Sequence, residues 1–186
     1  MYSSLFIGVV AGALLYSNFN LIGAVDAIVN ARQEYVFGAG SCKHLAGFLT
    51  HYLQLLVGKA RRVTVASPSQ ICEQMLDLNH EDVVIGISFP RYSKKSVQTL
   101  HYAHAKGAGV IALTDSKESP IAQNASQLLT ASSDMASFVD SLVAPLSIIN
   151  AIIAAVARKK KEELTTRLRT LEQIWDEYDV YEKHHE

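Results

Sequence analysis

Residues 34–42 read EYVFGAGSC, a short apolar run that ends in a Gly-x-Gly turn just before a helical pattern. Residues 35–37 are aromatic or β-branched, the types that favour strands. The glycines, Gly38 and Gly40, allow a tight turn and bring backbone N–H groups close to an anion at a helix N-terminus. This stretch therefore predicts a strand, a turn and a helix of an α/β sheet, with the turn as a candidate binding site.

The same order of elements recurs along the chain. Short β-branched runs predict four further strands, at residues 63–65, 83–88, 110–114 and 127–130. Several lack the polar alternation of a half-exposed strand, as expected of parallel strands that helices cover on both faces. Strands that alternate with helices imply right-handed crossovers. The sequence therefore predicts a three-layer αβα sandwich with a five-stranded parallel sheet.

Three serines mark predicted helix starts. Residues 67–70 (SPSQ) form a capping box with proline at the first helical position. Residues 119–120 repeat the Ser-Pro start, and Ser93 is placed to cap a helix that runs towards Gly107. These helices would cover the predicted sheet.

The C-terminal part predicts two long helices. Residues 138–157 are apolar nearly all round, which is typical of a helix buried on several sides. This helix and the N-terminal helix are candidate subunit contacts. One apolar stripe of a second helix follows, at Leu164, Leu168, Leu171, Trp175 and Tyr178. That stripe either packs on its own domain or contacts another subunit. We expect an N-terminal helical segment at residues 1–19 and a single domain, with these helices, at residues 20–186.

The composition describes a globular protein of 186 residues, with 49% hydrophobic residues and a formal net charge of −1. This balance gives no electrostatic reason for the chain to bind nucleic acid. The only cysteines, Cys42 and Cys72, form neither a disulfide framework nor a zinc motif, so we expect a reducing cytoplasm and no metal. The apolar runs 5–16 and 142–157 are too short to span a membrane, so we expect no membrane-spanning segment.

Polar residues gather where predicted strands end, which is where ligands bind to parallel sheets. Residues 88–95 (SFPRYSKK) bring hydroxyl groups, a guanidinium and two ammonium groups into one loop before a helix. Such groups suit a phosphate dianion, and Arg91 is able to hold two of its oxygens. The alternative is ordinary capping by Ser93, with Arg91 and Lys94 facing solvent.

A dinucleotide cofactor is disfavoured, and no cofactor is expected. Lys43 occupies the third glycine position of the dinucleotide fingerprint. No carboxylate follows the second predicted strand, where the ribose hydroxyls would need a partner.

Three segments that follow predicted strands resemble motifs of the SIS (sugar isomerase) domain. They are residues 38–42 (GAGSC), 88–93 (SFPRYS) and 119–122 (SPIA). The FPRYS loop and the closing residues 168–181 are similar to the MurR/RpiR family of transcription regulators, and the resemblance covers about residues 20–183.

The sequence departs from the family pattern at two places. Cys42 stands where the family has serine, although Ser41 lies beside it. Pro90 and Arg91 stand where many relatives have serine and glycine. Arg91 would then take over part of the charge of a bound phosphate.

The resemblance implies a phosphosugar-binding sensory domain that forms a homodimer or tetramer. Its ligand-binding residues would be Gly38, Gly40, Ser41, Cys42, Ser88, Arg91, Tyr92, Ser93 and Lys94. DNA would be bound only through a helix-turn-helix domain, for which residues 1–19 are too short. The chain is then either an excised sensor domain or a standalone SIS protein.

An enzyme is the alternative, because aldose–ketose isomerisation of a phosphosugar needs a base that carries a proton between neighbouring carbons. His44, Glu73, Asp115 and Glu118 lie near predicted strand ends, but no pair of them forms an acid–base constellation in the sequence. We therefore predict binding without turnover and assign no catalytic residue. A third possibility is a dimerisation module that has lost phosphate binding.

Overall fold

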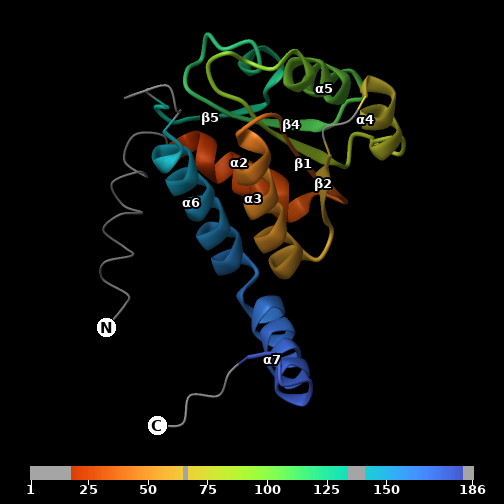
Figure 1. Ribbon diagram of the computed structural model, residues 1–186, viewed down its shortest axis with the longest axis vertical. Helices are drawn as coiled ribbons and strands as arrows, with labels where there is room; N and C mark the ends of the chain where they lie inside the picture. Colours follow the sequence, from red (N-terminus) through yellow and green to blue (C-terminus); the bar gives the residue numbers. More distant parts are fainter. Residues whose placement is uncertain (1–17, 65–66, 134–140, 182–186) are drawn as a thin grey trace.

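The computed structural model describes residues 18–64, 67–133 and 141–181. Five parallel strands form one sheet in the order β2-β1-β3-β4-β5 (Figure 1). The strands are β1 (Glu34–Gly38), β2 (Ala60–Val63), β3 (Val83–Ile87), β4 (Gly109–Thr114) and β5 (Gln127–Thr130). The predicted α/β sandwich with a five-stranded parallel sheet is confirmed.

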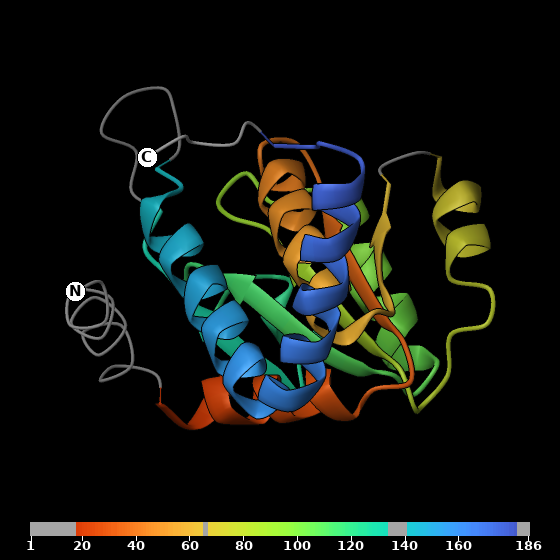
Figure 2. The same ribbon diagram turned by 90° about the horizontal axis from the view of Figure 1, so that it is seen from below.

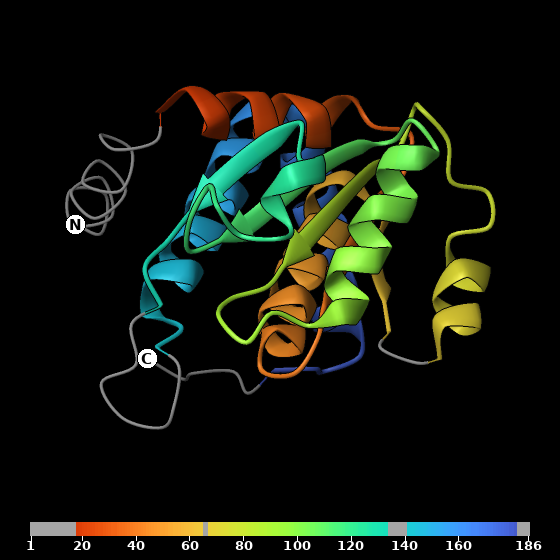
Figure 3. The same cartoon turned by 90° about the horizontal axis from the view of Figure 1, so that it is seen from above.

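Helices cover both faces of this sheet. One layer holds α2 (Asn18–Asn30), α3 (Cys42–Val57) and α6 (Val143–Lys159), which lie below the sheet in Figure 1. The opposite layer holds α4 (Pro68–Gln74) and α5 (Lys94–Ala105), and α5 lies over the strands when the molecule is seen from above (Figure 3). The short 3-10 helix η1 (Ala122–Asn124) precedes β5.

The central strands supply side chains to two apolar cores. Every residue of β1 and β3 is buried. Val36 and Ile85 pack with α2, α3 and α6, whereas Phe37 and Val84 pack with α4 and α5. Burial on both faces explains why these strands read as continuous apolar runs.

The second strand begins and ends earlier than predicted. It spans Ala60–Val63 instead of 63–65, and it pairs with β1 in the register Glu34↔Ala60. Arg61 and Arg62 are exposed in its centre because β2 is an edge strand. Charged residues at an edge are common and hide the strand signal in a sequence.

Of the predicted Ser-Pro helix starts, one is confirmed and one is wrong. At residues 67–70 the capping box is complete, with Gln70 N donating to Ser67 Oγ at 3.3 Å and Ser67 N donating to Gln70 Oε1 at 3.1 Å. At residues 119–120 only the 3-10 turn η1 follows, and Ser119 accepts from Ala122 N with its backbone oxygen. Only six residues, 121–126, lie between Pro120 and β5, and three of them form this turn, which leaves no room for an α-helix of ordinary length.

The predicted helix at 138–157 is α6, which begins at Val143; residues 138–140 lie outside the described part of the chain. It buries one side against α2 and α3, through Ile149, Ile152 and Val156. Its start is open, with Val143 75% exposed. Residues 144–157 are nonetheless all buried or half-buried, as predicted for a helix without a polar face.

The last helix, α7 (Lys161–Glu177), has no buried residue. It runs beyond the sheet in Figure 1 and lies beside α3 in Figure 2. Arg167 Nη2 donates to Gln54 O of α3 at 3.0 Å, while Leu168 and Tyr178 are 39% and 72% exposed. The apolar stripe is thus only partly covered by its own domain.

Two further sequence predictions concern the N-terminal segment and membrane-spanning helices. The N-terminal segment 1–19 lies outside the described residues except for its last two, which begin α2. In the described ranges, no helix is both long enough and apolar enough to cross a membrane.

Candidate functional site

A pocket of about 480 Å³ lies between the turn after β1 and the loop after β3. These two strands are neighbours in the sheet although β2 separates them in the sequence. The strand order reverses at this point, and open parallel sheets bind ligands at such a switch point. The pocket is lined by Ala39, Gly40, Ser41, Cys42, Ser88, Phe89, Pro90, Arg91 and Ser93.

The turn after β1 requires its two glycines for different reasons. A Cβ atom on Gly38 would lie 2.5 Å from the backbone oxygen of Cys42, so the strand and the helix approach too closely for a side chain. Gly40 instead has a φ of +60°, and a Cβ atom on it would meet no atom of the described residues within 4 Å. Both features bring the start of α3 against the end of β1.

Ser41 directly precedes α3, and its side chain does not cap the helix. It occupies the N-cap position, and its side chain makes no hydrogen bond to the helix. Its hydroxyl lines the pocket beside Cys42, which is buried. The hydroxyl therefore remains available to a ligand at the N-terminus of a 16-residue helix.

The loop after β3 contributes two more hydroxyl groups. Ser88 is buried, and its N–H donates to Leu113 O of β4 at 3.1 Å, which fixes the loop to the sheet. Ser93 occupies the N-cap position of α5 without a side-chain hydrogen bond to that helix. The side-chain cap expected in the alternative interpretation is thus absent, although Arg91 and Lys94 are both exposed, as that interpretation expects.

Arg91 supplies the positive charge of the pocket. It is exposed, lines the pocket and has a φ of 63°, an unusual value for a residue with a side chain. The N-termini of α3 and α5 adjoin the same space, and each carries a partial positive charge. Three hydroxyls, one guanidinium and two helix starts form a site suited to a phosphate dianion.

Six of the nine predicted site residues line the pocket: Gly40, Ser41, Cys42, Ser88, Arg91 and Ser93. Gly38 is the last residue of β1, directly before the turn, and Lys94 is exposed at the first position of α5. Tyr92 is turned to Asp115, and its hydroxyl donates to Asp115 Oδ1 at 2.7 Å. Sequence reasoning missed Ala39, Phe89 and Pro90, because apolar lining residues carry no chemical signal.

The possible bases named from the sequence lie away from the lining of this pocket. Asp115 accepts hydrogen bonds from Tyr92 and from Thr114 Oγ1, the latter at 3.0 Å. His44, Glu73 and Glu118 are exposed. No three His, Cys, Asp or Glu side chains of the described residues are close enough to hold a metal ion.

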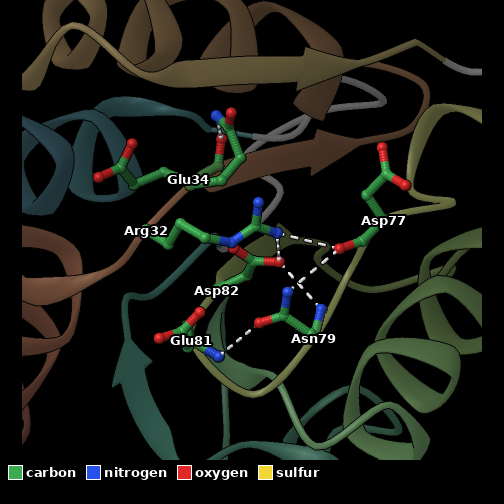
Figure 4. Close-up of polar contacts among 7 residues, drawn as sticks. Arg32, Glu34, Asp77, Asn79, Glu81 and Asp82 are labelled. Carbon is green, nitrogen blue, oxygen red and sulfur yellow. Dashed lines mark hydrogen bonds and ion pairs between the residues drawn. The ribbon is translucent and has the colours of Figure 1, made fainter.

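A second group of charges lies at the opposite end of the sheet (Figure 4). Arg32 Nη2 donates to Asp82 Oδ2 at 2.7 Å and to Asp77 O at 3.0 Å. Glu34, the first residue of β1, is fully buried and has no hydrogen bond to its carboxylate in the described part of the structure. The nearest cation is Lys59, with its Nζ atom 4.0 Å from Glu34 Oε1.

Burial of this carboxylate raises the pKa of Glu34 to about 7, although Lys59 opposes the shift. Nothing in the sequence singled out Glu34, because a charged residue at the start of a strand usually faces water. Glu34 lies at the start of β1, whereas the pocket lies beyond the end of that strand. Glu34 is therefore not part of the site, and we expect it to affect stability.

Known proteins share this fold and parts of this sequence. The family model described as the SIS domain matches residues 27–155. The sugar isomerase domain of an RpiR transcription factor from Sphaerobacter thermophilus is 27% identical, with a TM-score of 0.80, and the match covers 91% of this chain and 95% of that one. The Vibrio vulnificus NanR protein complexed with ManNAc-6P shares the fold at 13% identity, with a TM-score of 0.75 and coverage of 94% and 68%.

A curated relative links the chain to a larger protein. An uncharacterised HTH-type transcriptional regulator of Caldanaerobacter subterraneus is 31% identical over 103 residues. The match covers 53% of this chain but only 36% of the regulator. The matched region is thus about a third of that relative's length.

Proposed function

The chain belongs to the SIS domain family, and on that premise we propose that it is the phosphosugar-binding sensory domain of an RpiR-type transcription regulator. The observation that carries the proposal is the pocket at the switch point of the sheet. There Ser41, Ser88, Ser93 and Arg91 meet the starts of two helices. These groups recognise the phosphate, and the remaining space takes the sugar.

The size of the pocket supports a ligand larger than phosphate. Its volume of about 480 Å³ lies within the range of small-molecule sites, roughly 300–1,000 Å³. An inorganic phosphate would fill only the part next to the helix starts. A phosphosugar would use the rest, where Phe89 and Pro90 offer an apolar wall to the sugar ring.

The relatives support a regulator more than an enzyme. The RpiR transcription factor domain matches nearly the whole chain, and the curated relative is an HTH-type regulator. NanR, a protein of the same fold, is complexed with ManNAc-6P, which makes that compound a reasonable first ligand to test. We propose that DNA is bound by a helix-turn-helix domain of the whole regulator, in the cytoplasm.

The proposed mechanism links the pocket to the placement of subunits. A phosphosugar bridges the Gly38–Cys42 turn and the Ser88–Ser93 loop and holds them together. A second copy of the chain covers the apolar stripe of α7, and the ligand shifts the arrangement of the two copies. It does so only if it binds one arrangement more tightly than the other.

A thermal-shift screen against phosphosugars, ManNAc-6P included, tests the proposal. A ligand at 100 times its dissociation constant stabilises a fold by about 2.7 kcal/mol, a readily measured shift. We expect one phosphosugar to raise the melting temperature while its free sugar does not. The R91A and S93A variants should lose this shift and keep the melting temperature of the free protein within a few degrees.

Each other outcome has a definite meaning. If no phosphosugar shifts the melting temperature at millimolar concentration, the sensory proposal fails and a dimerisation module takes its place. If the phosphosugar that binds is also converted to its isomer, the domain is an aldose–ketose isomerase.

A further inference from the structure

The loop of the pocket contains a strained residue. Pro90, whose ring holds φ near −65°, is followed by Arg91 with a φ of 63°. A positive φ of this size is usually found at glycine, because a side chain is strained in the left-handed region. A side chain at such a position is strained, so other contacts must hold the loop in place.

The residue after Arg91 supplies such a contact. Tyr92 Oη donates to Asp115 Oδ1 at 2.7 Å, across 23 residues of sequence. Asp115 is held in turn by Thr114 Oγ1 at 3.0 Å, and Thr114 is the fully buried last residue of β4. The carboxylate is therefore fixed to the sheet, and through Tyr92 it fixes the loop.

The electrostatics of this contact favour a persistent bond. Burial and the bond to Asp115 raise the pKa of Tyr92 to about 12, so its hydroxyl keeps its proton at neutral pH. A neutral phenol that donates to a carboxylate forms a charge-assisted hydrogen bond, which is stronger than a bond between neutral groups. The contact is thus a suitable anchor for a strained neighbour.

We propose that the Tyr92–Asp115 hydrogen bond is a latch that holds Arg91 in the left-handed conformation, so that its guanidinium stands at the pocket. Tyr92 and Asp115 are then positioning residues that act through Arg91 and do not touch the ligand. This inference rests on the proposed function only for the identity of the anion. The latch itself is a property of the free protein.

A double-mutant cycle on stability tests the latch without any ligand. In the wild type, R91G removes the strain and should raise the folding equilibrium constant at least about fivefold. In the Y92F background the loop is free to relax, so R91G should gain less than about twofold. Urea unfolding of the wild type, R91G, Y92F and the double variant gives both values, and an equal gain in the two backgrounds overturns the latch.

Y52F provides the matched control. Tyr52 lies on α3 and is partly exposed, and its loss of a hydroxyl should leave the gain from R91G unchanged. If Y52F reduces that gain as much as Y92F does, the coupling does not come from the contact with Asp115, and the latch is overturned.

A second cycle tests positioning, with inorganic phosphate as the probe and binding measured by calorimetry. Y92F and R91A should each weaken phosphate binding, and the double variant should bind no more weakly than R91A alone. Additive losses would mean that Tyr92 acts independently of Arg91, and they would overturn the positioning role. If neither phosphate nor any phosphosugar binds the wild type, the proposed function fails, while the unfolding cycle still decides the latch.

Discussion

Gly38 and Gly40 are separated by a single residue, but substitution by alanine meets a different obstacle at each. At Gly38 the new Cβ atom would lie 2.5 Å from Cys42 O and 2.8 Å from Cys42 C, both of which are backbone atoms that cannot rotate away. At Gly40 no atom lies within 4 Å, and the cost is that of a positive φ alone. The first position is therefore limited by space and the second by conformation.

We predict that G38A lowers the free energy of unfolding by about 3 kcal/mol, as in overpacked sites. G40A should cost about 1 kcal/mol. Urea unfolding measures both. G107A is the control for G40A, because Gly107 also has a positive φ (+79°) and a Cβ atom there would meet only His80 Cβ, at 3.6 Å, among the described residues. A loss for G40A equal to that for G38A would contradict this account of the turn.

Glu34 provides the second residue-scale prediction, on the pH dependence of stability. Its pKa rises from 4.5 to about 7 on folding because the carboxyl group is buried. The folded protein then binds more protons than the unfolded chain between these pH values, so the free energy of unfolding falls as pH rises through them. The shift corresponds to a loss on the order of 3 kcal/mol.

We therefore expect E34Q to remove most of this slope and to be more stable than the wild type at pH 8. Urea unfolding at pH values from 5 to 8 measures the slope directly. E81Q changes an exposed carboxylate at the same end of the sheet and should leave the slope as it is. An E34Q variant with the wild-type slope would show that another group causes it.

At the scale of single helices, α5 buries a polar side chain that lacks a hydrogen bond among the described residues. Ser96 is fully buried, and its hydroxyl has no hydrogen-bond partner among the described residues. Thr99, one turn later, instead donates to Lys95 O at 2.8 Å. A buried hydroxyl without a partner destabilises the folded state relative to an apolar group of similar shape.

S96A should accordingly raise the free energy of unfolding by about 1 kcal/mol. Part of that gain is the better helix propensity of alanine. S147A in α6 serves as the control, because the Ser147 hydroxyl has a partner, Val143 O, at 3.0 Å. Thermal unfolding of both variants separates the effect of the buried hydroxyl from that of helix propensity. A gain for S147A as large as that for S96A would rule out an effect of the buried hydroxyl.

Local signals explain which elements the sequence predicts. The capping box at 67–70 is correct because the serine and the glutamine that satisfy each other are three residues apart. The Ser-Pro pair at 119–120 has the same local signal, but β5 follows too soon for a helix to form. The edge strand β2 was placed too late because Arg61 and Arg62 interrupt its apolar pattern.

The features of the site likewise divide into those that the sequence predicts and those that it does not. Ser41, Ser88 and Ser93 are predictable, because the ends of parallel strands and the starts of the following helices meet at one edge of the sheet. The bond between Tyr92 and Asp115 joins two loops that only the pairing of β3 and β4 brings together. Nothing near either residue in the sequence announces it.

At the scale of the whole molecule, the uncovered surface of α7 is the feature that a single chain leaves unexplained. Leu168 and Tyr178 of the apolar stripe are 39% and 72% exposed, and Ile174 of α7 is 43% exposed. The main contacts of this helix with the rest of the described chain are with α3 and α6. An apolar stripe of this kind usually marks an interface. A second copy of the chain is the partner that our proposed mechanism requires.

We predict that the wild type is a dimer or tetramer at micromolar concentration and that L168E makes it a monomer. The fold should survive, because Leu168 is not buried within the chain and a charge there remains in water. Analytical ultracentrifugation gives the mass, and circular dichroism checks the fold. L76E is the matched control, since Leu76 is 74% exposed just after α4, in the opposite layer, and its change should leave the mass unaltered. A wild type that sediments as a monomer, or an L168E variant with the wild-type mass, would show that α7 does not form the contact between subunits. Another surface would then have to transmit the signal from the pocket.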